Sequence, residues 1–274
     1  MSFLRAFFAR PQTLAGFCIF SAIAIIALAA PLLFPRGPFT IVGMPLLPPG
    51  ASGFAAGSDV LGRDMAAELA FGARISLLVG IASTIVSIGA GGVLGAVAGY
   101  HGGLVDDLLM RVTEFFQIIP SFVLVMVLVA FLQPSLASTV LGIALITWPQ
   151  VARVVRGEFL ALRQREFVAA ARMQGLGAGR IIFGEILPNA LGPIIVIATM
   201  VVGNAILTES ALSFLGLGDP NLMSWGSMVG GSRSSMWVAW WTMVLPGLCI
   251  MVTVLALNFI GDGLNDALNP RRGR

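Results

Sequence analysis

Long apolar runs, repeated from one end of this 274-residue chain to the other, constrain its fold more than any other feature. About 20 consecutive apolar residues in a helix cross the roughly 30 Å hydrocarbon core of a bilayer. Six runs are about that length or longer, at 13–34, 75–100, 115–132, 136–155, 189–216 and 236–260. They predict an all-α, polytopic membrane protein with about six transmembrane helices.

The composition excludes a soluble domain and a nucleotide-binding one. Charged residues make up 11% of the chain and hydrophobic residues 57%, whereas soluble domains carry about 25% charged residues. All 16 basic residues are arginines, because the sequence contains no lysine. A P-loop needs a lysine against the phosphates, so any ATP chemistry must come from a partner. The arginines flank apolar runs and form no single basic patch, so we expect no nucleic-acid partner.

The residues that usually carry catalysis or bind metals are scarce. Cys18 and Cys249 lie inside apolar runs and are interpreted as packing residues. His101 is the single histidine, so the sequence has too few suitable side chains for Ser-His or Cys-His catalysis or for a metal cluster. We expect no catalytic residue, no metal and no cofactor in this chain.

The arginines also predict the topology. With the N-terminus inside, the outer segments hold only Arg36, Arg63, Arg74 and Arg233, and the other twelve arginines fall in inner segments or adjoining span ends. This bias follows the positive-inside rule. It predicts a multi-pass membrane protein with both termini cytoplasmic.

The runs and the topology divide the chain into segments. These are a cytoplasmic N-terminus (1–12), a first transmembrane helix (13–34), an extracytoplasmic loop (35–74), a transmembrane core (75–262) with a cytoplasmic loop (156–188), and a cytoplasmic tail (263–274). The first helix resembles an uncleaved signal-anchor, because its run is longer than that of a cleaved signal peptide. Residues 64–74 predict a short amphipathic helix outside the membrane.

Two local patterns predict how the spans are shaped and packed. Gly91, Gly95 and Gly99 recur every four residues, which places small residues on one face where another helix backbone can approach. Pro120 lies inside the third span and predicts a kink there.

The loop at 156–188 is the longest polar stretch on the predicted inner side, and long loops usually have a function. Glu166 suits the first turn of a short helix, Ala169–Ala171 favour helix, and Gly175 is placed to end it. The pattern predicts a small helical knob suited to docking in a groove of another protein. The alternative is a surface helix that lies on lipid headgroups.

At this loop the sequence resembles a known family. Residues 166–175 read EFVAAARMQG, followed by RIIF at 180–183 and ILPN at 186–189. Their spacing is similar to the cytoplasmic "EAA" loop of ABC-importer permeases, and more narrowly to that of the dipeptide, oligopeptide and nickel importer family. The sequence departs from the motif at Ala169, where the family has Glu, and at Glu185, where an apolar residue is usual.

The resemblance implies that this loop forms a coupling helix, which seats on an ATPase subunit and transmits its closure to the membrane helices. The residues that it assigns to ATPase coupling are Glu166, Ala169, Ala170, Ala171, Gly175, Leu187 and Pro188. It also implies a type I ABC importer permease fold, working by alternating access in the bacterial inner (cytoplasmic) membrane. The implied partners are a homologous second permease, ATP-binding subunits and an extracytoplasmic substrate-binding protein. Di- or oligopeptides are the expected cargo, with nickel or another small solute as the alternative.

Three further stretches extend the resemblance over nearly the whole chain. GSDVLGRD at 57–64, with GARISL at 72–77, resembles the family's approach to its second span. The other two are AILTESALSFLGLG at 205–218, followed by SWG at 224–226, and GDGLNDALNPR at 261–271. Together they are similar to the second of the two permeases that such importers pair.

Several polar and aromatic residues have both a functional and a structural interpretation. Glu209 is the one acid within an apolar run, which makes it a candidate for the translocation path or gate. Its structural alternative, near the outer end of the fifth span, is solvation or a hydrogen bond to a neighbouring helix. Asp107 and Arg111 are one helical turn apart and are expected to form an ion pair, with contact to an ATPase as the alternative. An outer aromatic belt is expected to contain Trp225, Trp237, Trp240 and Trp241, with docking of a substrate-binding protein as the alternative.

Two other classes of function compete with the importer. An ion-coupled secondary transporter needs coupling sites near the bilayer midplane in broken helices, for which Glu209 alone is thin support. An intramembrane enzyme such as a protease would have to work with one histidine, no lysine and no paired intramembrane acids. Transport under a proton gradient without an ATPase would favour the first class, and cleavage of a membrane substrate would favour the second.

Overall fold

The computed structural model describes residues 7, 8 and 10–268. Over this part of the chain the structure is helical and has no strand, only the isolated bridges Ile41–Arg63 and Ser58–Asp64. The expected all-α fold is confirmed. Positions 1–6, 9 and 269–274, which belong to the expected cytoplasmic N-terminus and tail, lie outside the described residues.

The helices agree with about six spans. In chain order they are α2 (Pro11–Leu33), η1 (Ala51–Gly53), α3 (Met65–His101), α4 (Gly103–Ile118), α5 (Ser121–Leu132), α6 (Leu136–Leu162), α7 (Glu166–Met173), α8 (Ala178–Arg180), η2 (Ile181–Ile186), α9 (Leu187–Phe214), α10 (Trp225–Gly231) and α11 (Trp241–Leu268). Five helices are long and apolar enough to cross a membrane, with α8, η2 and α9 continuous as Ala178–Phe214. The bent pair of α4 and α5 makes six if it is one span.

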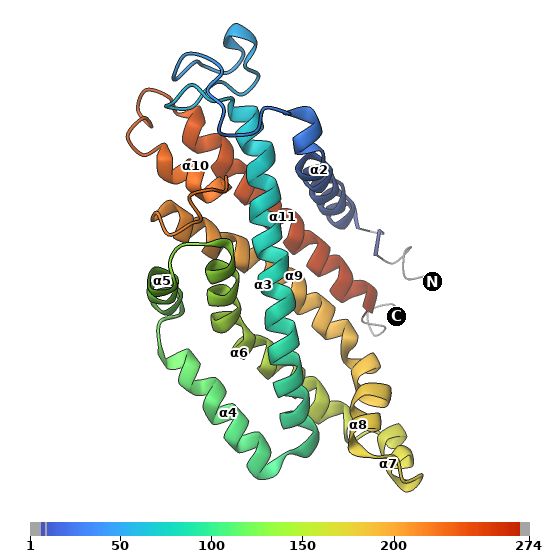
Figure 1. The fold of residues 1–274 in the computed structure, drawn as a ribbon. Coiled ribbons are helices and arrows are strands. Elements are labelled where there is room, and N and C mark those ends of the chain that lie inside the picture. Colours follow the sequence, from blue (N-terminus) through green and yellow to red (C-terminus); the bar gives the residue numbers. More distant parts are fainter. Residues whose placement is uncertain (1–6, 9, 269–274) are drawn as a thin grey trace.

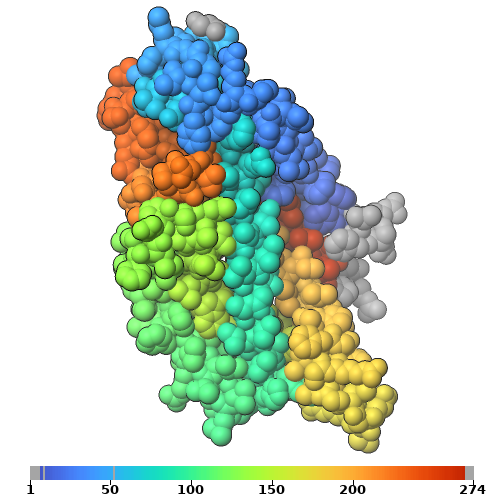
Figure 2. Space-filling view, viewed as in Figure 1, coloured from blue at the N-terminus to red at the C-terminus, as the bar shows by residue number. Residues whose placement is uncertain are grey.

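The helices form one elongated bundle, and α3 runs along most of its length (Figure 1). The loop at 34–64 and helix α10 lie at one end, which we call the loop end. Helix α7 and the start of α4 lie at the opposite end, which we call the knob end. In the space-filling view the loop end is blue and orange and the knob end is green and yellow (Figure 2).

Helix α3 begins ten residues earlier than the expected second span. The separate surface helix expected at 64–74 was wrong, because these residues form the N-cap and the first turns of one 37-residue helix. Asp64 caps that helix by accepting a hydrogen bond from the backbone N–H of Ala66, at 2.9 Å. At 1.5 Å per residue, α3 is about 55 Å long, so it exceeds a hydrocarbon core of about 30 Å.

The expected kink at Pro120 is confirmed as a full break. Helices α4 and α5 meet at an angle of 81°. Ile119 is extended, with φ −78° and ψ 130°, because proline disfavours the helical conformation of the residue before it. Pro120 itself has no backbone N–H to continue the helix.

The glycines of α3 allow a close approach of α6, as their spacing predicted. A Cβ added to Gly91, Gly95 or Gly99 would lie closer than 3.0 Å to backbone atoms of α6. The packing of α3 on α6 therefore depends on the absence of side chains at these three positions.

The ends of other spans also differ from the expected ones. Helix α6 continues to Leu162, and the next helical segment starts at Ala178, so only 163–177 of the expected loop at 156–188 separates the two spans. Helix α11 starts at Trp241 and not at Met236, because residues 232–240 form turns.

Candidate functional site

Helix α7 is the predicted knob, and its ends follow from its sequence. Glu166 lies in the first turn and Arg172 in the last, where each charge is favourable to the helix dipole. Gly175 takes a left-handed φ of 76°, and its N–H donates to the carbonyl of Arg172 at 2.9 Å. Leu176 N–H donates to the carbonyl of Ala171 at 3.2 Å, which completes a glycine-type C-terminal cap. The predicted helix and its stop are confirmed.

One face of α7 is buried and the opposite face is exposed. Val168 is 0% exposed, and Ala171 is also buried, both in an apolar cluster with Ile181, Ile182 and Ile186. The knob is therefore seated on η2 by apolar packing.

The exposed face of α7 is largely apolar. Met173 is 90% exposed, and Phe167, Ala169 and Ala170 are exposed beside Glu166. Sequence reasoning missed both Phe167 and Met173. Met173 lies on the side of the helix opposite the buried Val168 and Ala171, which could have revealed it, whereas Phe167 is one turn before Ala171 and lies at the edge of the buried face. An exposed apolar face on a protruding helix is the kind of surface that a groove of another protein can cover.

The knob is also tied to the end of α3. Arg163 donates to the carbonyls of Gly99 and Tyr100, at 3.3 and 3.2 Å. The guanidinium of Arg172 lies over the ring of Tyr100, 5.4 Å from its centroid. These contacts place the end of α6 and helix α7 beside the end of α3.

The seven residues assigned to ATPase coupling do not form one surface. Glu166, Ala169, Ala170 and Gly175 are exposed at the knob end, whereas Ala171 is buried. Leu187 is partly buried and packs against the apolar cluster that holds Ala171, and Pro188 is exposed on α9.

The ion pair expected between Asp107 and Arg111 is absent from the described residues. Instead, Asp106 pairs with Arg156, which donates through Nε and, at 2.6 Å, through Nη2. This bidentate ion pair joins α4 to α6. Local spacing could not predict it, because the partners are 50 residues apart in the sequence.

Glu209 lies near the loop end of α9 and is only 2% exposed. Its carboxylate accepts hydrogen bonds from Ser213 on α9, at 2.6 Å, and from Ser76 on α3, at 3.1 Å. Ser76 Oγ in turn accepts from the backbone N–H of Trp225 at the start of α10, at 3.4 Å. The carboxylate is thus the centre of a polar clamp that joins α3, α9 and α10, and we call this set the Glu209 clamp.

A cavity of about 10 Å³ adjoins Glu209, among residues that include Thr139 and Asp219. That volume corresponds to about one water molecule. A larger cavity, of about 370 Å³, is lined by Ser213 of the clamp. Glu209 lies 22 residues beyond Leu187 on the same helix, which is about 33 Å away.

The aromatic belt expected near the outer face was wrong for two of its four tryptophans. Trp225 is 1% exposed and its indole N–H donates to the carbonyl of Leu69 at 3.0 Å. Trp241 is also buried, and its indole N–H donates to the carbonyl of Ser58 at 3.3 Å. Trp237 and Trp240 are exposed, as a belt requires.

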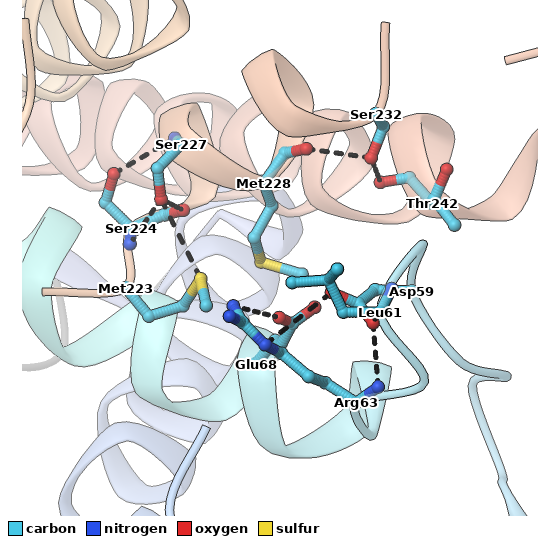
Figure 3. A network of polar contacts seen from close by, with 10 residues as sticks. All are labelled: Asp59, Leu61, Arg63, Glu68, Met223, Ser224, Ser227, Met228, Ser232 and Thr242. Atoms are coloured by element: carbon cyan, nitrogen blue, oxygen red, sulfur yellow. Dashed lines mark hydrogen bonds and ion pairs between the residues drawn. The ribbon is translucent and has the colours of Figure 1, made fainter. Parts of the chain in front are cut away.

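A second polar network lies at the loop end (Figure 3). Asp59 closes its own loop by accepting from the backbone N–H groups of Leu61 and Arg63, at 2.9 and 2.7 Å. The guanidinium of Arg63 lies 3.8 Å from the carboxylate of Glu68 in the first turn of α3. Sequence reasoning missed Glu68, because it assigned this stretch to a surface helix.

This network borders a cavity of about 220 Å³ between the loop at 34–64 and the segment that contains α10. Arg63, Glu68 and Asp219 line it together with the methionines Met223 and Met228. In the described part of the chain, no group of three or more His, Cys, Asp or Glu side chains is arranged to hold a metal ion.

Comparisons with known proteins agree with this architecture. Residues 91–274 match the family described as "Binding-protein-dependent transport system inner membrane component". The di/tripeptide transport system permease of Pseudomonas aeruginosa (strain UCBPP-PA14) is 38% identical, over 98% of this chain and 91% of that protein. The dipeptide transport system permease of Alkalihalophilus pseudofirmus is 42% identical, over 93% of this chain and 84% of that protein. The oligopeptide transport system permease of Haemophilus influenzae is 39% identical, over 97% and 87%.

A solved structure shares the fold. A chain of the MetNI methionine ABC transporter, in inward-facing conformations, matches with a TM-score of 0.61 over 73% of this chain and 96% of that chain. The two are 17% identical, so the match establishes the fold alone, that of a type I ABC importer permease.

Proposed function

The chain belongs to the family of binding-protein-dependent transport system inner membrane components, and from this membership we propose that it is the permease subunit of an ATP-driven importer of di- or oligopeptides. The relatives named as di/tripeptide, dipeptide and oligopeptide permeases support peptides as the cargo. Nickel or another small solute is the alternative cargo.

The α7 knob is the observation that carries the proposal. It protrudes at the knob end (Figure 1), and its exposed face presents Phe167, Ala169, Ala170 and Met173. We propose that an ATP-binding subunit covers this face in a groove, so that ATP hydrolysis takes place in that partner and not in this chain. Glu166, Ala171, Gly175, Leu187 and Pro188 then shape or support the docking surface.

The remaining assembly follows from the family. A homologous second permease completes the translocation path, and an extracytoplasmic substrate-binding protein delivers the cargo. The knob end faces the cytoplasm in this arrangement, the loop end faces outward, and both termini are cytoplasmic. The bias of twelve inner to four outer arginines supports this orientation.

We propose that α9 transmits movement between the two ends. The helical segment Ala178–Phe214 is 37 residues long, or about 55 Å, and starts directly after the knob. When the ATP-binding subunits close, they displace α7 and therefore the base of α9. The Glu209 clamp makes the loop end of α9 move together with α3 and α10, which gives Glu209 a part in the gate without contact with cargo.

Substituting arginine for one exposed methionine at each end of the bundle tests the docking proposal. Met173→Arg places a charge on the apolar face of the knob, whereas Met44→Arg makes the same change at an exposed site in the outer loop. In membranes that contain the candidate ATP-binding subunits, we expect Met173→Arg to abolish their co-purification and the ATP-dependent uptake of a labelled dipeptide. Met44→Arg should leave co-purification unchanged. Equal co-purification by both variants would overturn the knob as the docking site.

The same membranes separate the competing functions. Uptake that a proton gradient drives without ATP-binding subunits would favour an ion-coupled secondary transporter. Uptake of nickel or another small solute, without uptake of the dipeptide, would keep the ATP-driven mechanism and change only the cargo.

A further inference from the structure

An apolar groove lies between α3 on one side and η2 with the start of α9 on the other. Its volume is about 320 Å³, and its twelve lining residues are all apolar or glycine. Helix α3 lies beside the yellow segment that contains η2 on the face seen in Figure 2. Val93, Phe183 and Leu191 line the groove and are exposed, so its mouth opens at the protein surface.

The groove exists because α3 carries a second set of glycines. The space beside Gly91, Gly95 and Gly99 is occupied by α6, as described above. Gly89 and Gly92 point elsewhere, and a Cβ added to either would meet nothing within 4 Å. Helix packing does not require glycine at these two positions, yet both line the groove. Their missing side chains leave room for a ligand.

The length of the groove favours a lipid chain over a transmembrane helix. Its α3 wall extends from Ile88 to Val97, which is about 14 Å at 1.5 Å per residue. That is roughly half of a hydrocarbon core of about 30 Å, or the depth of one leaflet. A helix of a second permease would need a contact surface along most of a span.

A positive charge lies at the knob end of the groove. Arg180 directly precedes η2 and lies about one turn before the groove residue Phe183. It is exposed and forms no salt bridge with any residue that the structure describes. Arginine suits phosphate, which it can hold with two parallel hydrogen bonds.

We propose that this groove binds one acyl chain of an anionic membrane phospholipid, whose phosphate pairs with Arg180. An apolar trough about one leaflet deep with a free guanidinium at its end is complementary to such a lipid in both shape and charge. The bound chain packs on Ile182 and Phe183 of η2, which is a π-helical segment, and such segments are frequent at functional sites. Because Ile182 belongs to the same apolar cluster as Val168 and Ala171 of α7, the lipid supports the base of the knob.

Filling the groove tests the binding of the chain. Gly92→Leu places a side chain in the empty space, and Gly247→Leu is its matched control, because Gly247 is a helical glycine of α11 that also meets nothing within 4 Å. The full chain is purified from vesicles of phosphatidylglycerol and phosphatidylcholine, and the lipid it retains is measured by native mass spectrometry. We expect Gly92→Leu to retain about tenfold less phosphatidylglycerol, since losing the burial of about two methylene groups has that effect. Gly247→Leu should retain as much as the unchanged chain.

Removing the charge tests the headgroup. We expect Arg180→Gln to bind phosphatidylglycerol and phosphatidylcholine equally, whereas the unchanged chain should prefer phosphatidylglycerol.

Two results would overturn the proposal. One is retention of phosphatidylglycerol by Gly92→Leu that equals the retention by Gly247→Leu and by the unchanged chain. The other is a cysteine at Val93 that crosslinks to a homologous second permease and to no photoreactive lipid, because the groove would then be a subunit interface. Neither result depends on which cargo the protein carries.

Discussion

The two ends of α9 are held by different kinds of interaction. At the knob end, Val168 and Ala171 of α7 are buried with Ile181, Ile182 and Ile186 in an apolar cluster, and the polar contacts to α3 come from Arg163 and Arg172 outside that cluster. At the loop end, the Glu209 clamp joins three helices through hydrogen bonds to a buried carboxylate. One helix therefore connects an apolar joint to a polar one.

The difference suits the two tasks that we propose for these ends. Apolar contacts are not directional, so a small knob can shift on its seat while it stays buried. Buried hydrogen bonds have strict geometry, and a buried polar group that loses its partner is costly. The polar joint should therefore hold its helices in one register, and the apolar joint should tolerate movement. The following changes test this contrast.

The largest effect on stability is expected at the polar joint. Glu209→Ala removes the acceptor for Ser76 and Ser213 and leaves a cavity, so we expect a loss of about 3 kcal/mol. Thermal unfolding in one detergent measures the loss, and Ser213→Ala, which removes a single bond, should cost about 1 kcal/mol. If Glu209→Ala and Ser213→Ala were equally stable, the carboxylate would not be the centre of the clamp.

A smaller and local effect is expected at the apolar joint. Val168→Ala removes two methyl carbons from a fully buried side chain, which should cost about 2 kcal/mol. Hydrogen exchange should rise over residues 163–177 and stay unchanged around Glu209, because the knob can open without the rest of the bundle. Equal increases at both ends would show that the two joints are not independent.

The smallest effect is expected at the end of the knob. Gly175→Ala keeps the surface nearly unchanged but forces an L-residue into a left-handed φ of 76°, at a cost of about 1 kcal/mol. The affinity for an ATP-binding subunit should fall about fivefold, because part of the binding free energy is spent on restoring the turn. Gly177→Ala, at a nearby exposed glycine without positive φ, is the matched control and should bind normally.

Local sequence signals predicted much of this molecule. The apolar runs predicted the number and class of spans, Pro120 predicted the break between α4 and α5, and Gly175 predicted the end of α7. The start of α3 was missed although Asp64 is a good N-cap, because charged residues after it suggested a surface helix. A charge near a span end does not stop a helix whose other face is buried.

Other features depend on residues that are distant in the sequence. Arg156 pairs with Asp106 and not with a neighbour, and Trp225 is buried because α3 and α9 enclose it. A tryptophan near a membrane surface has the same local sequence whether it faces lipid or protein, so its exposure could not be predicted.

The sequence by itself determined that this chain is a bundle of membrane-spanning helices with a helical knob between two of them, because hydrophobic length and helix-end signals act over a few turns. The tertiary structure decided which glycines of α3 are packed and which are open, since Gly91 and Gly92 differ only in the direction they face. It also decided that Glu209 is a clamp among serines from different helices. Such contacts depend on how helices pack side by side, and a pattern along one helix does not contain that information.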